Sequence, residues 1–271
     1  MISLIKAIAV DMDGTFLNHQ GQYNHQYFAQ ILQRLQAVDI QLIVASGNPY
    51  YQLQGQFPGL SSQLAFVAEN GVECIDHDRF TYCGQVAPEP IQGILKLHQS
   101  IKDSDFLLSG RHHAFVFDDA SAYFREHIQS HYPNFRLIHD LRAVDDQIVK
   151  LQLEVPVAIK DQVQAQINHD FKGQLTAVTS GYGNLDIIVA GMDKATGLQH
   201  LLDQYQLTAN QLMAFGDGQN DVTMLKLAGE SYAMQKADPR AIAVANHRAP
   251  SNDDDGVLQV IDQFLNNLKE G

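Results

Sequence analysis

Two short clusters of acidic residues carry the side chains best suited to chemistry. In the first, DMDGT, Asp11 and Asp13 stand two residues apart at the end of an apolar run. In the second, GDGQND, Asp217 is followed by Asn220 and Asp221. Carboxylates brought together would repel one another, and a hard divalent cation with oxygen ligands removes that cost. If the two clusters meet in the fold, we expect a metal site with Mg²⁺ as the ion.

Two further segments could bind a phosphate group beside such a metal. Ser46, in VASGN, offers a hydroxyl donor next to Gly47, where backbone N–H groups could also bind an anion. Lys194, in GMDKATGL, would stand at the start of a helix and supply a positive charge. Taken singly, each residue has an ordinary alternative as a turn serine or a surface lysine, and a lone DxDG could be a solvated turn.

The segments before these residues have the pattern of an α/β fold. IKAIAV, QLIVASG and LAFVAENG are short apolar runs that end in small polar residues, which is typical of buried strands in a parallel sheet. Between the first two, apolar residues recur at helical spacing from Tyr27 to Leu35, with Asn24 as the candidate N-cap. Because open α/β sheets bind ligands at the carboxyl ends of their strands, this fold would bring the polar residues together.

The middle of the chain has a different pattern. Apolar residues alternate from Val149 to Val155, which is typical of a half-exposed antiparallel sheet. Turn-forming residues cluster in CGQVAPEP and SGYGNLDIIVAG, on either side of this region. We therefore predict a Rossmann-like core with a parallel sheet and an inserted α+β cap domain, the core comprising residues 1–82 and 189–271 and the cap residues 83–188.

Composition limits the classes of partner. The net charge of −13 and the pI near 5.2 give no footprint for nucleic acid, and no apolar run is long enough to span a membrane. Cys74 and Cys83 have the spacing of neither a redox pair nor a zinc site, so we expect free thiols. These features favour a cytoplasmic protein with a small-molecule ligand and leave the oligomeric state open.

Taken in order, DMDGT, ASGNP, the DK before a helix, and GDGQND resemble the four motifs of the haloacid dehalogenase-like hydrolases. More narrowly, the chain resembles the Cof-type phosphatases, which carry a large α+β cap between the second and third motifs. AENGV after the third apolar run and SNDDDGV near the C-terminus are similar to that family as well. There are two departures: Ala195 follows the lysine where many relatives have glycine, and Asn48 replaces a frequent arginine.

The resemblance implies a phosphoric monoester hydrolase in which Asp11 attacks phosphorus and forms an aspartyl-phosphate. Asp13 would protonate the leaving alkoxide and later take a proton from the attacking water. The Asp11 carboxylate, the backbone carbonyl of Asp13 and the Asp217 carboxylate would hold Mg²⁺. Asp221 would orient Lys194 or a metal-bound water, and the phosphate-binding residues would be Ser46, Gly47, Lys194 and Asn220.

The implied substrates are small phosphomonoesters, with sugar phosphates favoured over pyridoxal phosphate and flavin mononucleotide. The cap would select among them, with Arg111, His112, His113 and Tyr182 as candidate contacts; an exposed turn without a ligand is the simpler reading of the two histidines. A phosphosugar mutase and a non-catalytic sensor of phosphorylated metabolites are alternative functions. Net release of phosphate would distinguish a phosphatase from both.

Overall fold

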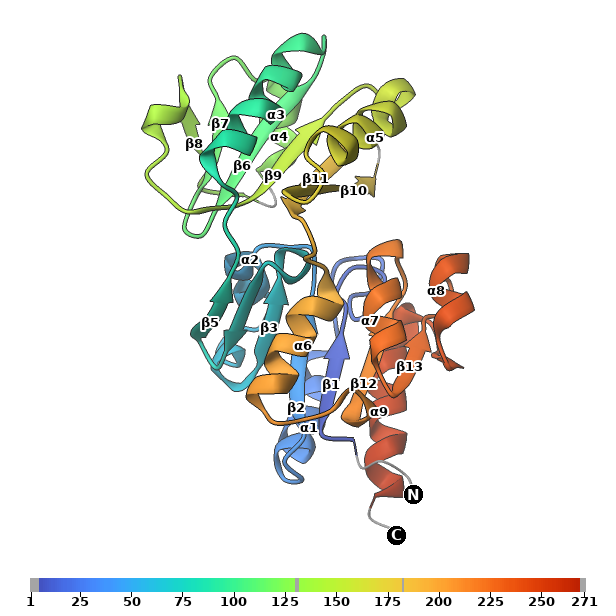
Figure 1. Ribbon diagram of the computed structural model, residues 1–271. Coiled ribbons are helices and arrows are strands. Elements are labelled where there is room, and N and C mark those ends of the chain that lie inside the picture. Colours follow the sequence, from blue (N-terminus) through green and yellow to red (C-terminus); the bar gives the residue numbers. More distant parts are fainter. Residues whose placement is uncertain (1–4, 130–131, 182, 269–271) are drawn as a thin grey trace. The chain divides into compact units, whose positions relative to one another are not determined.

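A computed structural model describes residues 5–129, 132–181 and 183–268 of the chain (Figure 1). The chain divides into two compact units. The first, the core unit, consists of Met1–Gly47, Phe57–Tyr82 and Asp193–Gly271. The second, the insert unit, consists of Asn48–Gln56 and Cys83–Met192.

An eight-stranded sheet forms the centre of the core unit, in the order β14-β13-β12-β1-β2-β3-β4-β5. All neighbours from β14 to β3 pair in parallel, and β4 runs antiparallel to β3. The predicted α/β class with a parallel sheet is confirmed. The strands are β1 (Ala7–Val10), β2 (Gln41–Ala45), β3 (Ala65–Ala68), β4 (Glu73–Asp76), β5 (Arg79–Cys83), β12 (Leu212–Gly216), β13 (Glu230–Ala233) and β14 (His247–Arg248).

Helices cover both faces of this sheet. In Figure 1, α6 and α7 lie in front of the strands, and α1 packs with α9 on the other face. The predicted cap of α1 is confirmed, because the Asn24 side chain accepts a hydrogen bond from the backbone N–H of Tyr27. Tyr27 itself is not in the core; its hydroxyl donates to Asp262 of α9 at 3.0 Å. The helices are α1 (His25–Gln36), α6 (Lys194–Gln204), α7 (Val222–Leu227), α8 (Pro239–Val244) and α9 (Gly256–Asn267).

The insert unit contains a six-stranded sheet in the order β10-β11-β9-β6-β7-β8. Its neighbours are antiparallel except β7 and β8, which run parallel. The strands are β6 (Asp105–Gly110), β7 (Ala114–Phe117), β8 (Arg136–Ile138), β9 (Ile148–Glu154), β10 (Leu175–Gly181) and β11 (Asn184–Val189). The helices assigned to this unit are α2 (Tyr50–Gln56), α3 (Pro88–Ser100), α4 (Ala122–Ile128) and α5 (Lys160–Asp170).

The prediction that this sheet is half-exposed is wrong for part of it. One face packs against α3 and α5 through a cluster that includes Phe115 and Leu151. The other face of β6 and β7 is covered as well, because Val116 packs in a second cluster with Phe124 of α4. All four residues of β7 are therefore buried. Alternation within the strands could not reveal this second apolar layer, since α4, the helix that follows β7 in the chain, supplies it.

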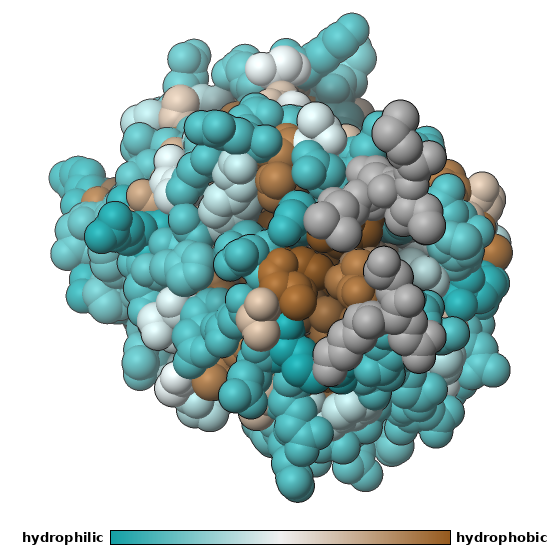
Figure 2. Space-filling view, turned by 90° about the horizontal axis from the view of Figure 1, so that it is seen from below, coloured by the Kyte–Doolittle hydropathy of each residue, from teal (hydrophilic) through white to brown (hydrophobic). Residues whose placement is uncertain are grey.

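Hydrophilic residues predominate on the face of the molecule that Figure 2 shows. A hydrophobic area lies near the centre of this face, and smaller hydrophobic areas are scattered among the hydrophilic residues. Among the described residues, no helix combines the length and the apolar character needed to cross a membrane. Neither cysteine forms a disulfide, as predicted, with Cys74 buried and Cys83 half-buried.

Candidate active site

The candidate residues gather at one edge of the core sheet. Asp11 directly follows β1, Ser46 follows β2, and Asp217 follows β12. Because β12, β1 and β2 are parallel neighbours, their carboxyl ends lie side by side (Figure 1). The order of the strands therefore places these three residues together, although they are distant in sequence.

Lys194 is the central cation of this site. It is the first residue of α6, and Asp193 caps the helix by accepting a hydrogen bond from the backbone N–H of Thr196. The Lys194 side chain is fully buried, and its Nζ lies 2.5 Å from Asp11 Oδ1 and 2.6 Å from Asp221 Oδ1. One ammonium thus links two motifs that are more than 200 residues apart.

Asp221 holds the start of the second acidic cluster in place. It is fully buried, and its Oδ2 accepts hydrogen bonds from the backbone N–H groups of Asp217 and Gly218 at 2.9 and 2.8 Å. The Asp217 carboxylate is fixed in turn by Thr15, whose hydroxyl donates to Oδ1 at 2.9 Å. Sequence reasoning missed Thr15, although it is the last residue of DMDGT.

Three carboxylates converge in the site and could hold a metal ion. Asp11, Asp217 and Asp221 each offer an oxygen, and these oxygens all lie within 4.8 Å of one another. Carboxylate oxygens are the ligands that hard dications such as Mg²⁺ prefer, so the donor set fits the predicted ion. Sequence reasoning placed Asp221 outside the metal ligands; the structure places it in the cluster while its Oδ1 contacts Lys194.

The electrostatics of the cluster favour a cation. Burial, together with the charge of Asp221, raises the pKa of Asp11 well above its usual range, against the opposing effect of Lys194. Burial and Asp221 raise the pKa of Asp217 as well. Burial alone would lower the pKa of Lys194, but the charges of Asp11 and Asp221 outweigh it and the pKa is raised. Three carboxylates around one ammonium leave an excess of negative charge that a dication would neutralise.

Asp13 lies where the chain turns directly after β1. Strand β1 ends at Val10, and the chain then turns so that the N–H groups of Thr15, Phe16 and Leu17 all donate to the carbonyl of Met12. Asp13 is exposed, whereas Asp11 is buried. The two carboxylates therefore lie in different environments directly after the strand.

Asn70 joins Ser46 and Asn220, two of the three phosphate-binding candidates that lie outside the acid–lysine cluster. Its backbone N–H donates to the carbonyl of Ser46 at 3.0 Å, and its side-chain Oδ1 accepts from Asn220 Nδ2 at 3.2 Å. Ser46 and Asn70 are buried, and Asn220 is exposed. Sequence reasoning assigned no role to Asn70; the only signal for it was the AENGV segment.

Two glycines explain how the motifs approach so closely. Gly14 has a φ of +80°, and a Cβ there would lie 2.5 Å from Asp217 Oδ2. Gly197, in the first turns of α6, has no room either, because its Cβ would lie 2.5 Å from Val67 Cγ1 and 2.9 Å from Gly71 Cα. The close contact between α6 and the segment around Gly71 is therefore made at Gly197, three residues after Lys194. Glycine is not needed directly after the lysine, and Ala195 leaves Lys194 in the site.

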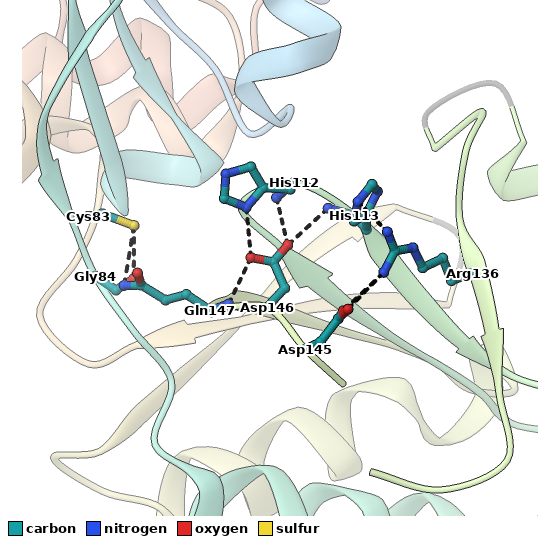
Figure 3. Close-up of polar contacts among 8 residues, drawn as sticks. All are labelled: Cys83, Gly84, His112, His113, Arg136, Asp145, Asp146 and Gln147. Atoms are coloured by element: carbon teal, nitrogen blue, oxygen red, sulfur yellow. Dashed lines mark hydrogen bonds and ion pairs between the residues drawn. The ribbon is translucent and has the colours of Figure 1, made fainter. Parts of the chain in front are cut away.

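Two of the candidate substrate contacts of the insert unit, His112 and His113, belong to one polar network (Figure 3). Asp146 accepts from the backbone N–H groups of His112 and His113, from His112 Nδ1 and from the N–H of Gln147, at 2.7 to 3.0 Å. His113 Nε2 lies 2.7 Å from Arg136, which also pairs with Asp145. Neither histidine is therefore without contacts. Tyr182 lies outside the described residues.

The chain is similar to a known protein family and to solved structures. The profile of the haloacid dehalogenase-like hydrolases matches residues 8–261. The chain belongs to this family. It is 34% identical to the 5-amino-6-(5-phospho-D-ribitylamino)uracil phosphatase of Escherichia coli over 96% of both chains, and 24% identical to a phosphoglycolate phosphatase of Methanococcoides burtonii over 97% of this chain and 98% of that one. A crystal structure of a Streptococcus mutans UA159 protein superposes with a TM-score of 0.91 at 38% identity, covering 96% of this chain and 99% of that chain.

This membership confirms the family inferred from the four motifs and the enzyme class, a phosphatase. Solved members with lower identity share the fold, including a haloacid dehalogenase-like hydrolase from Bacteroides thetaiotaomicron with a TM-score of 0.83 at 24% identity. The relatives named above differ in their substrates, so the family establishes the class of reaction and leaves the leaving group open.

Proposed function

We propose that the protein is a Mg²⁺-dependent phosphatase that hydrolyses small phosphomonoesters through an aspartyl-phosphate. The observation that carries this proposal is the buried Lys194 ammonium held between Asp11 and Asp221 at the carboxyl edge of the sheet. Lys194 opposes the rise in the Asp11 pKa that burial causes, and so favours the ionised carboxylate that a nucleophile requires. Membership in the hydrolase family supports the same chemistry.

Asp11 is the proposed nucleophile. One of its carboxylate oxygens attacks phosphorus, the bond from phosphorus to the ester oxygen breaks, and Asp13 gives its proton to the departing alkoxide. Water then attacks the aspartyl-phosphate, Asp13 takes a proton from that water, and phosphate and free Asp11 are released. The exposed position of Asp13 suits this role, because the acid must exchange protons with the leaving group and with water.

The remaining core residues bind the metal and the phosphate. Asp11, Asp217 and the backbone carbonyl of Asp13 would hold Mg²⁺, which would supply positive charge opposite the phosphoryl oxygens. Lys194, the Ser46 hydroxyl, the Gly47 backbone and the Asn220 amide would bind those oxygens. Asp221 would act as a positioning residue, since it holds Lys194 with one oxygen and the backbone of residues 217 and 218 with the other.

The proposed substrates are phosphorylated sugars and sugar alcohols. The Escherichia coli relative is named for a substrate with a phosphorylated ribityl chain, and flavin mononucleotide carries the same chain. Hydrolysis of either compound would release a sugar-alcohol hydroxyl as the leaving group. We propose that residues 83–188 act as the cap domain that selects the leaving group. A cytoplasmic location stays a prediction.

Release of inorganic phosphate tests this function. We expect the wild-type protein with Mg²⁺ to hydrolyse at least one member of a panel of sugar phosphates, 5-amino-6-(5-phospho-D-ribitylamino)uracil, flavin mononucleotide, pyridoxal phosphate and phosphoglycolate. EDTA and Asp11→Asn should each abolish release. Trapping with acid after brief mixing should recover label from a ³²P-substrate on the wild-type chain and none on Asp11→Asn.

Other outcomes identify the alternatives. Transfer of phosphate between positions of one sugar, without net release, would indicate a mutase. Binding of Mg²⁺ and phosphate without turnover of any substrate would indicate a sensor. Unchanged hydrolysis in Asp11→Asn would contradict the proposed nucleophile.

A further inference from the structure

A short segment after β3 has an unusual backbone. Glu69, Asn70 and Gly71 have φ values of 49°, 55° and 97°, so three consecutive residues are left-handed. Such conformations are disfavoured for residues with a side chain, and they persist only where the surrounding structure holds them. The segment is also buried, which is uncommon for a glutamate and an asparagine.

The segment packs against the start of α6. A Cβ on Gly71 would lie 1.9 Å from the carbonyl oxygen of Asp193, the N-cap residue of the helix. Gly197 approaches Gly71 from the same helix. These contacts fix the segment relative to Lys194, which is the next residue after the cap.

Asn70 also contacts the other side of the phosphate site. Its N–H donates to the carbonyl of Ser46, and its Oδ1 accepts from Asn220 Nδ2. Its amide lies beside Gly47, since a Cβ there would be 3.1 Å from Asn70 Nδ2 and 3.2 Å from Oδ1. One buried residue thus adjoins three of the four groups to which we assign phosphate binding.

We propose that Asn70 is a positioning residue for the phosphate site, an inference that rests on the proposed function. A side-chain amide nitrogen carries two N–H donors, so Asn220 can donate to Asn70 and to a phosphoryl oxygen at the same time. The left-handed backbone directs the Asn70 N–H to Ser46 while its side chain meets Asn220. Asn70 therefore sets the Ser46 turn and the Asn220 amide at a fixed separation before phosphate binds.

The test uses substitutions that separate backbone from side chain. Asn70→Gly retains a residue that accepts positive φ but removes the amide. We expect it to remain folded, to weaken inhibition by inorganic phosphate roughly tenfold and to raise KM by a similar factor. The Mg²⁺ concentration for half-maximal activity should not change, because no hydrogen bond joins Asn70 to the three carboxylates in the described residues. A general loosening of the site would alter both the phosphate inhibition constant and the Mg²⁺ dependence.

Asn70→Asp keeps an oxygen that can accept from Asn220 but adds a negative charge beside the phosphate. We expect a weaker phosphate affinity in this variant than in Asn70→Gly, although its side chain is closer in shape to asparagine. Asp39→Gly is the matched control, since Asp39 is an exposed residue of the core unit with a φ of 54°. It should leave the phosphate affinity and the Mg²⁺ dependence at wild-type values.

The outcomes separate this proposal from the function on which it rests. If the wild-type protein releases phosphate and Asn70→Gly has the same phosphate inhibition constant, the positioning role is wrong and the phosphatase proposal stands. An equal shift in the phosphate and Mg²⁺ constants would also overturn it, in favour of a purely structural role. If the wild-type protein releases no phosphate from any substrate, the proposed function itself fails.

Discussion

The core unit contains a cluster of three carboxylates and the insert unit a single largely buried one, and their negative charge is balanced differently. In the core unit, Asp11, Asp217 and Asp221 share one ammonium, that of Lys194. In the insert unit, Asp146 is a single carboxylate that accepts four hydrogen bonds from N–H donors of its own neighbourhood (Figure 3). The three core carboxylates carry more negative charge than the one ammonium neutralises. The Asp146 carboxylate has its hydrogen-bonding capacity filled by neighbouring N–H groups.

This difference is also seen in the pKa shifts of the two sites. Burial raises the pKa of Asp11 and Asp217, and a further cation would stabilise their charged forms. Burial also acts to raise the pKa of Asp146, but the hydrogen bonds from His112, His113 and Gln147 outweigh it and the pKa is lowered. An incompletely neutralised cluster is typical of a ligand site, whereas a fully hydrogen-bonded carboxylate is typical of a brace for the turn that it holds.

The largest effect should follow from removing the central cation. Lys194→Met keeps much of the side-chain length but leaves buried carboxylates without their ammonium. We expect kcat to fall by about 10²–10³-fold or more and the metal-free protein to lose about 3–5 kcal/mol of unfolding free energy. Saturating Mg²⁺ should recover part of this stability by binding the folded state. Phosphate release and urea unfolding with and without Mg²⁺ measure these effects.

Lys236→Met is the control for that variant. Lys236 pairs with Asp253 on the surface, with 74% of its side chain exposed. Such pairs contribute about 0–1 kcal/mol, so activity and stability should remain close to wild type. Similar losses in the two variants would mean that the core cluster is no more sensitive to charge than the surface.

The two units should also differ in how well they tolerate an added methyl group at a glycine with positive φ. Gly71→Ala places a Cβ 1.9 Å from the Asp193 carbonyl, at a φ of +97°, so something in the core site must move. We expect a loss of about 3 kcal/mol or more, together with loss of activity. Gly173→Ala in the insert unit has a similar φ of +80° but no atom within 4 Å, so only the backbone strain of about 1–2 kcal/mol applies.

Thermal unfolding and phosphate release distinguish these two variants. The melting temperature should fall clearly more in Gly71→Ala, and activity at low temperature should be retained in Gly173→Ala. Equal losses would show that left-handed strain, and not the contact with α6, is the dominant constraint at Gly71.

The smallest effect concerns the pH dependence of the insert unit. The pKa of Asp146 is lower in the folded chain than the value near 3.9 of an unfolded aspartate. Its stabilisation is therefore fully present above about pH 4 and is lost as the pH falls through the folded-state pKa. Asp146→Ala should lower the melting temperature at pH 7, by an amount corresponding to about 2–3 kcal/mol.

The difference between wild type and Asp146→Ala should shrink as the pH is lowered below 4. Asp161→Ala is the control in the same unit, because 91% of the Asp161 side chain is exposed. It should leave the melting temperature nearly unchanged at every pH. A difference for Asp146→Ala that is constant from pH 7 to pH 3 would contradict the assignment of the pKa shift.

Much of the candidate site could be predicted because its residues follow strands. Asp11, Ser46 and Asp217 come at the ends of apolar runs, and parallel strands bring their carboxyl ends to one edge. The position of Lys194 at the start of a helix could also be predicted, since Asp193 is a good N-cap residue. The exposure of Asp13 was not readable, because the length of the strand before it depends on hydrogen bonds across the sheet.

By itself, the sequence determined the parallel core, the order of the four motifs and hence the hydrolase family, because apolar periodicity and motif spacing are properties of the chain. Only the tertiary structure decided which polar groups meet. Three contacts depend on which strands are neighbours and on how closely Gly71 and Gly197 let α6 approach. They are the Lys194 ammonium between two distant carboxylates, Thr15 on Asp217, and Asn70 between Ser46 and Asn220. Contacts between residues far apart in the chain are set by packing, and packing has no local signature in the sequence.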